Sequence, residues 1–231
     1  MWAQELNRVF ADVAPNYDRA NYVAGLGLWS RFLQAFMSVN ELRPGQRTLD
    51  VCAGTNAIGI ALLRREPTLE VHAIDRSAEM QTVGRQCVYD RGFHIYGVIG
   101  DVHTLPFPDN HFDVVTLQFA SRPLRVRTVF GEILRVLKPG GHFYHCDMLR
   151  PANPAVEKFY YAYLRICLTF TGFLFRSDES ALNYKKYFID ALETFYSADE
   201  LSELMRGLGF CEVSAKSIFA GMIGCYRAAK K

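Results

Sequence analysis

Four polar residues in this sequence each follow a short apolar run, and their spacing suggests that they surround one ligand. Asp50, Asp75, Asp101 and Gln118 stand at or just after the ends of four predicted strands. In an open parallel sheet the carboxyl ends of the strands converge on one crevice, where the strand order reverses. A single acid after a strand is more often a helix cap or a turn former. Four such residues in this order predict a binding site.

The first of these places is a small-residue loop that leads straight into an amphipathic segment. Residues 50–56 read Asp-Val-Cys-Ala-Gly-Thr-Asn, without the full G-x-G-x-x-G spacing of a dinucleotide site. This strand–loop–helix order brings a backbone close to a nucleotide-like ligand, and Gly54 removes the Cβ that would clash. Asp50 beside the loop suits a cationic ligand better than a pyrophosphate. That preference favours a sulfonium over NAD.

The next two acids have separate expected tasks. Asp75 lies about twenty residues beyond the loop, where an acid can accept hydrogen bonds from both hydroxyls of a ribose. Asp101 follows Gly100 and can accept from the exocyclic amine of adenine, with Val102 against the ring.

The elements that must position these residues alternate between strands and helices. We predict strands at 47–51, 70–74, 95–99, 112–117, 141–148, about 212–217 and about 221–227, and helices at 58–65, 126–137 and 198–208. A further helix begins after the N-cap Ser77, with Met80 and Val83 on its buried face. Ser197 and Glu200 form a capping box, and Gly209 ends that last helix. The alternation predicts an α/β fold, a doubly wound, mostly parallel, seven-stranded sheet whose last two strands form an antiparallel edge hairpin.

The chain is expected to form a single domain, residues 1–231. It would contain a helical segment at 1–45, the binding core at 46–150, an inserted, aromatic-rich helical cover at 151–197, and the last helix with its hairpin at 198–231.

Composition excludes several classes of function. The net charge of +2, without a clustered basic face, argues against nucleic acid as a partner. No signal peptide and no uncharged apolar run of about 20 residues is visible, so we expect no transmembrane segment. The six cysteines lack ligand spacing, which favours a reduced, cytoplasmic chain without a metal site over a disulfide framework. These are Cys52, Cys87, Cys146, Cys167, Cys211 and Cys225.

Several stretches resemble class I S-adenosylmethionine-dependent methyltransferases, and more closely the ubiquinone/menaquinone biosynthesis C-methyltransferases. Val9–Asn21 is similar to the family's V-F-x-x-V-A-x-x-Y-D-x-x-N, and Leu105–Asp113, Leu134–Gly141 and Phe219–Arg227 match further family stretches. The resemblance covers nearly the whole chain. It implies a Rossmann-like fold, S-adenosylmethionine as cofactor, and C-methylation of a prenylated quinol ring, with demethylmenaquinol as the leading substrate.

The resemblance also assigns residues. Tyr17 and Asn21 would lie in an N-terminal lid over the cofactor, Arg122 would face the substrate, and Asp147 would end the fifth strand. The cofactor-binding residues expected from the pattern and the resemblance together are Tyr17, Asp50, Ala53, Gly54, Thr55, Asn56, Asp75, Arg76, Met80, Asp101, Val102 and Gln118.

The sequence departs from the family in three places. The family's G-T-G loop reads Gly54-Thr-Asn56, and Asn tolerates a left-handed backbone better than other non-Gly residues. The family's G-L-R-N stretch reads Ala-Ser-Arg-Pro at 120–123, and its D-P-E-A-Y stretch is not recognisable in 177–187. Two alternatives therefore stay open: a methyltransferase for another small lipophilic or phenolic molecule, and a catalytically silent cofactor-binding subunit.

Methylation of a hydroquinol carbon requires a negative charge on the neighbouring phenol oxygen. Arg122 is the expected stabiliser of that charge, or the residue that orients a proton-accepting water. Asp147 is the expected second catalytic residue, and Asp147, His145 and His103 are the candidate bases. Each of these three has an ordinary structural alternative: a cap or an ion pair with arginine for Asp147, core packing for His145 and a loop role for His103.

The aromatic segment 156–175 and the last hairpin raise questions of partners. The segment can be a core-facing helix, or it can form a tunnel for an isoprenoid tail with an apolar side at the bilayer surface. A peripheral contact with the inner face of the membrane is compatible with both. The hairpin at 212–227 can pair across a homodimer.

Overall fold

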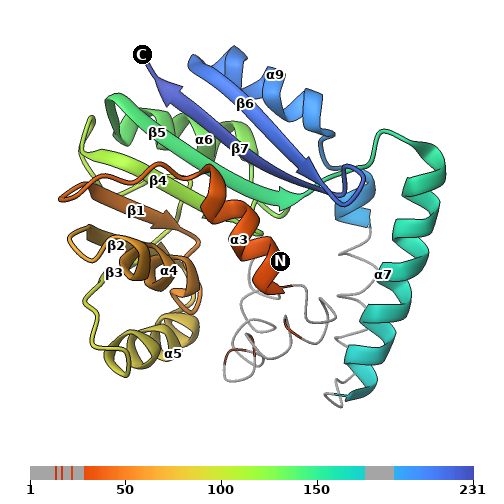
Figure 1. Cartoon of the computed structure of the whole chain (residues 1–231), viewed down its shortest axis with the longest axis horizontal. Coiled ribbons are helices and arrows are strands. Elements are labelled where there is room, and N and C mark those ends of the chain that lie inside the picture. Colours follow the sequence, from red (N-terminus) through yellow and green to blue (C-terminus); the bar gives the residue numbers. More distant parts are fainter. Residues whose placement is uncertain (1–13, 15–16, 18–21, 23–28, 175–189) are drawn as a thin grey trace.

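The fold is built on a sheet of seven strands with helices packed against both of its faces (Figure 1). The computed structural model describes residues 14, 17, 22, 29–174 and 190–231. The strand order is β3-β2-β1-β4-β5-β7-β6. The strands are β1 Arg47–Val51, β2 Glu70–Asp75, β3 Tyr96–Ile99, β4 Phe112–Gln118, β5 Leu137–Met148, β6 Phe210–Ile218 and β7 Ile223–Lys230.

Strands β1 to β5 are parallel, and β7 runs antiparallel between β5 and β6. The doubly wound, mostly parallel sheet is thereby confirmed. The helices with described bounds are α3 Trp29–Val39, α4 Ala57–Arg65, α5 Ala78–Tyr89, α6 Val126–Val136, α7 Pro154–Leu174 and α9 Ala198–Leu208.

The central strand β4 shows why the sheet needs both layers of helices. Successive side chains of a strand point to opposite faces, so an apolar run is stable only where both faces are covered. Val114 packs in the same apolar cluster as Phe36 of α3 and Leu62 of α4. Val115, its neighbour in the chain, packs with Phe130 of α6 in the other cluster.

The predicted caps of α5 and α9 are confirmed. The Ser77 hydroxyl accepts from the Met80 amide at 3.2 Å, and Ser197 with Glu200 forms the complete capping box of α9. Gly209 ends α9 with φ 107°, in the left-handed region that favours glycine. These caps are local interactions, so a sequence pattern is enough to find them.

Two local predictions were wrong. The fifth strand begins at Leu137 rather than at residue 141, because the pairing register with β4 shifts and 138–141 form an irregularity within the strand. In α5, Val83 is only half-buried, while Gly84 is buried against the loop before α4. The last two strands are antiparallel as predicted; of the two, β7 lies inside the sheet and β6 forms one of its edges.

Helix α7 stands beyond the carboxyl ends of the central strands (Figure 1). Its Tyr160, Tyr161 and Leu164 are buried together with Leu192, which supports the core-facing interpretation for one side of the helix. No helix of the described residues is long and apolar enough to cross a membrane. Most of the predicted N-terminal lid, Asn21 included, and residues 177–187 lie outside the described residues.

Candidate active site

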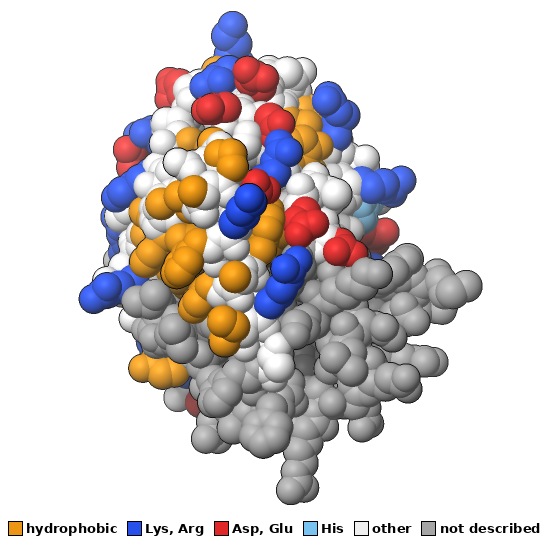
Figure 2. Space-filling view, turned by 90° about the vertical axis from the view of Figure 1, so that its right-hand side faces the viewer, with side chains coloured by type: hydrophobic (Ala, Val, Ile, Leu, Met, Phe, Trp, Pro, Cys, Tyr) orange, Lys and Arg blue, Asp and Glu red, His pale blue; other side chains and the backbone are white. Residues whose placement is uncertain are grey.

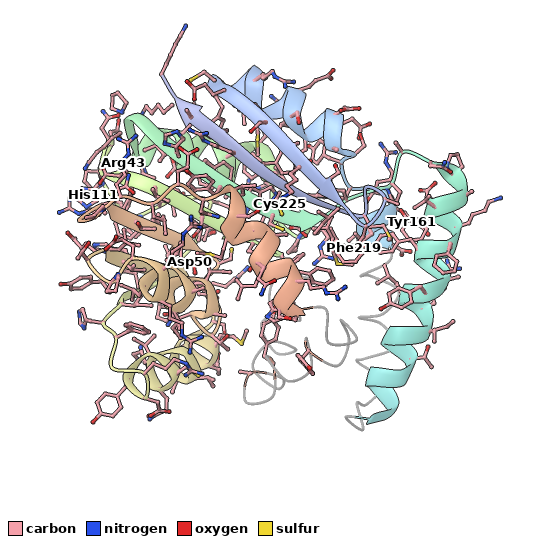
Figure 3. The ribbon with its side chains drawn as sticks, in the orientation of Figure 1. Arg43, Asp50, His111, Tyr161, Phe219 and Cys225 are labelled. Carbon is pink, nitrogen blue, oxygen red and sulfur yellow. The ribbon has the colours of Figure 1, made fainter. Side chains whose placement is uncertain are left out.

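The carboxyl ends of the parallel strands form one continuous edge, and the predicted site residues stand along it. Val51 of β1 is in register with both Ile74 of β2 and Leu117 of β4. The order reverses between β1 and β4, and Asp50 lies at the end of β1 there (Figure 3). The ends of β2, β3 and β4 bring Asp75, Asp101 and Gln118 to the same edge, and β5 adds Asp147. The expected convergence is therefore present.

Asp50 is a buried acid with one unused oxygen. Its Oδ1 accepts from the Thr116 hydroxyl at 2.7 Å, across the point where the strand order reverses. Its Oδ2 has no hydrogen-bond partner among the described residues. Burial raises the pKa of Asp50 to about 7, against the lowering effect of the Thr116 hydrogen bond. A cation bound near Asp50 would favour its ionised form.

The loop after β1 is held by backbone contacts with the end of β2. The Ala53 amide donates to the Ile74 carbonyl at 3.1 Å, and the Gly54 amide donates to Asp75 Oδ2 at 2.8 Å. Asp75 Oδ1 accepts from the Ser77 amide at 2.9 Å, so one carboxylate ties the loop to the start of α5. Burial raises the pKa of Asp75. The Arg76 amide also acts on this carboxylate, and of its roughly four acceptor positions one remains for a ribose hydroxyl.

Asn56 has the left-handed backbone that the sequence comparison anticipated, with φ 61° and ψ 24°, and it is buried. Its side chain lies against α5, where Gln81 Nε2 donates to the Gly54 carbonyl at 3.0 Å and to Asn56 Oδ1 at 3.3 Å. Thr55 is also buried. Gln81 was missed by sequence reasoning, because a lone glutamine on a helix carries no pattern that points to a loop.

The residues expected around adenine differ in their burial. Val102 and Met80 are buried, whereas Arg76 is exposed. Asp101 is mostly exposed, and its Oδ1 accepts from the His103 amide at 3.0 Å and pairs with the ring Nδ1 at 2.7 Å. These hydrogen bonds lower the pKa of Asp101.

Tyr17 and Gln118 are the two remaining cofactor candidates. Tyr17 is half-buried, and the residues on either side of it are not described. Gln118 ends β4, and its Nε2 is buried without a hydrogen-bond partner among the described residues. Gln118 therefore stands at the predicted strand end, beside Cys146 of β5, whose thiol its side chain contacts.

Arg122 and Asp147, the two expected catalytic residues, form an ion pair at 3.3 Å between Nε and Oδ1. The Asp147 side chain is fully buried and that of Arg122 is only 10 % exposed. Arg122 also donates to the Phe119 carbonyl at 3.3 Å and contacts the Met148 sulfur at 3.2 Å. The pair therefore holds the guanidinium in a fixed place at the edge of the sheet.

The Asp147 carboxylate accepts more hydrogen bonds than the sequence suggested. Its Oδ2 accepts from the amide and the hydroxyl of Ser121, at 2.8 Å and 2.6 Å, and its Oδ1 accepts from the Met148 amide at 2.7 Å. With Arg122, four donors surround this carboxylate. Ser121 was missed because its role depends on β4 and β5 lying side by side, which residue type and spacing do not reveal.

The two candidate histidines are engaged elsewhere. His145 is buried, its Nδ1 lies 2.9 Å from the Leu117 carbonyl, and its ring stacks on Phe143. Burial lowers the pKa of His145, as expected for a neutral core residue. His103 links Asp101 to the Arg125 amide, which lies 3.2 Å from its Nε2. Of the alternatives left open, the structure supports core packing for His145 and a loop role for His103.

Tyr160 of α7 was not among the predicted site residues. Its phenol oxygen is buried without a hydrogen-bond partner among the described residues. Burial raises the pKa of Tyr160, and the charges of Arg122 and Asp147 act on the same phenol. Met148, which Arg122 contacts, packs against the apolar cluster that contains Tyr160. An open cavity of about 330 Å³ adjoins Arg122, between the start of α6 and residues 191–196.

The strand order, the glycine loop flanked by acids where the order reverses, and the charge pair beyond β4 define a class I methyltransferase. The chain belongs to the ubiE/COQ5 methyltransferase family, whose sequence profile matches residues 2–230. It is thus an S-adenosylmethionine-dependent methyltransferase.

Known relatives match nearly the full length. A demethylmenaquinone methyltransferase of Anoxybacillus flavithermus is 34% identical over 224 residues, which span 95% of this chain and 92% of the relative. A ubiquinone/menaquinone biosynthesis C-methyltransferase, UbiE, of Azotobacter vinelandii is 32% identical over 235 residues, spanning 99% of this chain and 90% of the relative.

Solved structures support the fold. A SAM-dependent methyltransferase of Thermotoga maritima superposes with a TM-score of 0.67 at 19% identity, covering 97% of this chain and 99% of that one. A phosphoethanolamine N-methyltransferase of Haemonchus contortus, solved with S-adenosyl-L-methionine, gives a TM-score of 0.63 at 15% identity, covering 88% and 53%.

Proposed function

We propose that this enzyme methylates a ring carbon of a prenylated quinol, with demethylmenaquinol as the substrate. The observation that carries the proposal is the buried Arg122–Asp147 pair, which stands at the same sheet edge as the cofactor loop. The near full-length relatives named for demethylmenaquinone and for ubiquinone/menaquinone biosynthesis point to the same class of acceptor.

The residues of the first half of the site suit S-adenosylmethionine. The unpaired Oδ2 of Asp50 offers a buried negative charge to a cationic ligand, and Asp75 offers an acceptor position to a ribose hydroxyl. The side chain of Asn56 lies toward α5, so this departure from glycine does not fill the loop. When bound, S-adenosylmethionine supplies an electrophilic methyl group on a sulfonium, which leaves as a neutral thioether.

The second half of the site provides what the acceptor ring needs. Arg122 lies where its positive charge can stabilise a phenolate, so that electron density reaches the neighbouring ring carbon. That carbon forms the new bond to the methyl group and then loses its proton to water, which restores the aromatic ring. The buried Tyr160 hydroxyl is available to donate to the same oxygen.

Asp147 has a positioning role in this proposal. Because four donors already surround its carboxylate, it is a poor acceptor for a substrate proton. It fixes Arg122 and offsets the cost of burying a guanidinium. The proton of the phenol therefore goes to water near Arg122 rather than to Asp147.

The test is incubation of the protein with labelled S-adenosylmethionine and a short-chain demethylmenaquinol, followed by mass spectrometry of the extracted quinone. One added methyl group on the ring is expected. A prenylated benzoquinol and an unprenylated naphthol serve as alternative acceptors. Methylation of the naphthol alone would refute the quinol proposal, and cofactor binding without any product would favour the silent-subunit alternative.

We also propose that α7 touches the cytoplasmic surface of the membrane. The lipophilic substrate is dissolved in that membrane. Phe159 and Ile166 are 73% and 69% exposed, and with Ala155 and Ala162 they recur at helical spacing on one face. Figure 2 shows hydrophobic side chains gathered on this side of the molecule, with both basic and acidic side chains among them. Exposed basic residues near an apolar helical face suit an anionic bilayer.

Sedimentation with vesicles tests this contact. The double substitution Phe159→Ser, Ile166→Ser is expected to reduce binding to vesicles that contain anionic lipid. Tyr89→Ser is the matched control, because Tyr89 is 79% exposed on α5. Equal binding by wild type and the double variant would contradict the proposal.

A homodimer through the edge strand β6 is the remaining proposal. Residues 214–217 of β6 are exposed, and among the strands that the structure describes β6 pairs with β7 alone. Light scattering over a range of concentrations should give twice the 26.3 kDa of one chain. A mass of one chain at all concentrations would exclude this dimer.

A further inference from the structure

The side of the cofactor loop that faces α5 carries an arrangement that the methyltransferase assignment does not explain. Gln81 is completely buried and donates to two places in the loop, the Gly54 carbonyl and Asn56 Oδ1. The Gly54 amide is held from the other side by Asp75. Both polar groups of the Gly54 backbone are therefore fixed, one by a strand and one by a helix.

Gly84 lies one helical turn beyond Gln81 and completes this contact. A Cβ placed on Gly84 would lie 2.6 Å from Asn56 Nδ2, 3.1 Å from Asn56 Cγ and 3.0 Å from the carbonyl carbon of Thr55. The first distance is far below normal contact. Asn56 itself is 2% exposed, so its side chain has no free space into which it could move.

The two residues therefore fit as a pair. A left-handed residue at position 56 would ordinarily be glycine, which leaves no side chain to pack. Here an asparagine takes the same backbone conformation, fills the space that Gly84 leaves open, and accepts from Gln81. The loop is thus packed against α5 by a side chain, where a glycine would leave a gap.

We propose that Asn56, Gln81 and Gly84 form a positioning unit that sets the shape of the cofactor loop from α5, so that Asn56 strengthens cofactor binding. The inference rests on the cofactor assignment. It reverses the simple expectation that glycine, the residue of the family's loop, would improve binding at position 56.

Two single substitutions and their combination give the sharpest test. Asn56→Gly leaves a void beside Gly84 and removes one acceptor of Gln81, so S-adenosylmethionine should bind about 5-fold to 10-fold more weakly. Gly84→Ala forces its methyl group against Asn56 and should weaken binding by at least about 10-fold. In the double variant the alanine methyl group no longer meets the Asn56 side chain but still lies 3.0 Å from the carbonyl carbon of Thr55, so affinity should recover in part and lie closer to wild type than in either single variant. Calorimetry on the full chain measures each affinity.

Two further variants guard the interpretation. Gly131→Ala is the matched control, because this helical glycine of α6 has nothing within 4 Å of a new Cβ, and affinity should not change. Gln81→Met keeps most of the volume but loses the donor, so affinity should fall while the melting temperature stays near that of wild type.

The outcomes are separable. Absence of S-adenosylmethionine binding by the wild type would refute the cofactor assignment itself. Binding by the wild type with an unchanged or tighter Asn56→Gly variant, or an equal effect of Gly84→Ala in both backgrounds, would overturn the positioning unit alone. If a single variant does not fold, far-ultraviolet melting shows it, and Gln81→Met then decides: unchanged affinity in that variant overturns the proposal.

Discussion

The two halves of the site are held in place by different kinds of contact. On the cofactor half, the Asp75 carboxylate is fixed by main-chain amides of the loop and of the start of α5. On the acceptor half, Arg122 is fixed by the side chain of Asp147, which Ser121 holds in turn. These main-chain contacts do not depend on the side chains of the loop residues, and the side chains of Gln81 and Asn56 add to them from α5. In the second half, amides of Ser121 and Met148 hold Asp147, but the place of the Arg122 guanidinium depends on the Asp147 side chain.

The largest expected effect is the loss of Arg122. Arg122→Ala should lower turnover by about 10²-fold to 10³-fold, because a group that stabilises developing negative charge is lost. Affinity for S-adenosylmethionine should change by less than about 3-fold. Calorimetry and steady-state rates on the same preparation measure both quantities.

Arg122→Lys is the companion variant. It keeps the charge but loses the planar guanidinium, so turnover should fall between those of wild type and Arg122→Ala. Equal losses of affinity and turnover in Arg122→Ala would show that the two halves are not separate.

The second prediction concerns Asp75. Asp75→Asn keeps the shape but removes the charge and leaves one oxygen for the amides of Gly54 and Ser77, so cofactor affinity should fall about 10-fold to 100-fold. Turnover at saturating cofactor should be nearly kept. Glu79→Gln, at an exposed acid in the first turn of α5, is the control and should leave affinity unchanged.

The third prediction is a pH dependence that only the cofactor half should show. Because the pKa of Asp50 is about 7 in the folded protein, affinity for the cationic cofactor should rise about tenfold between pH 6 and pH 8, as Asp50 ionises. Asp50→Asn should remove that rise. Calorimetry at a series of pH values measures it, and an identical slope in both proteins would contradict the assignment of the charge.

Asp50 also makes the stability of the ligand-free protein depend on pH. The free energy of unfolding should fall as the pH rises, whereas cofactor affinity should increase. In the unfolded chain the Asp50 carboxyl ionises near its ordinary value of 3.8, whereas the folded protein keeps the proton until about pH 7. The contribution of Asp50 to the free energy of unfolding is therefore fully present below about pH 4 and is lost as the pH rises toward 7. Denaturant titrations of wild type and Asp50→Asn without ligand should show this difference.

The smallest expected effect belongs to Tyr160. Tyr160→Phe removes a buried hydroxyl that has no partner among the described residues, so stability should stay within about 1 kcal/mol or rise slightly. Turnover should fall by about 3-fold to 10-fold if the hydroxyl donates to the acceptor oxygen. Thermal unfolding and initial rates check the two expectations, and unchanged turnover would remove Tyr160 from the acceptor half.

The contrast between the halves also explains what the sequence could predict. The positions of Asp50, the loop and Asp75 could be predicted because each lies within a few residues of a strand end, which gives a recognisable spacing in the sequence. The capping of α5 and α9 is equally local. The strand order then placed these residues on one edge, as the alternation of strands and helices implied.

The contacts that were missed all join elements far apart in the chain. Ser121 reaches Asp147 across 26 residues, and Gln81 reaches Gly54 across 27. Neither serine nor glutamine is unusual at its own position, so only the packed structure reveals the partner. The void beside Gly84 that Asn56 fills is likewise a property of two elements in contact.

A single-turnover experiment with the cofactor at saturation tests most directly whether one half of the site binds the cofactor and the other half promotes methyl transfer. Wild type, Asp75→Asn and Arg122→Ala would each be loaded with labelled S-adenosylmethionine and mixed with demethylmenaquinol. We expect Asp75→Asn to transfer its methyl group at nearly the wild-type rate, and Arg122→Ala to stay loaded without transfer. Fast transfer by Arg122→Ala, or slow transfer by a fully loaded Asp75→Asn, would contradict the account.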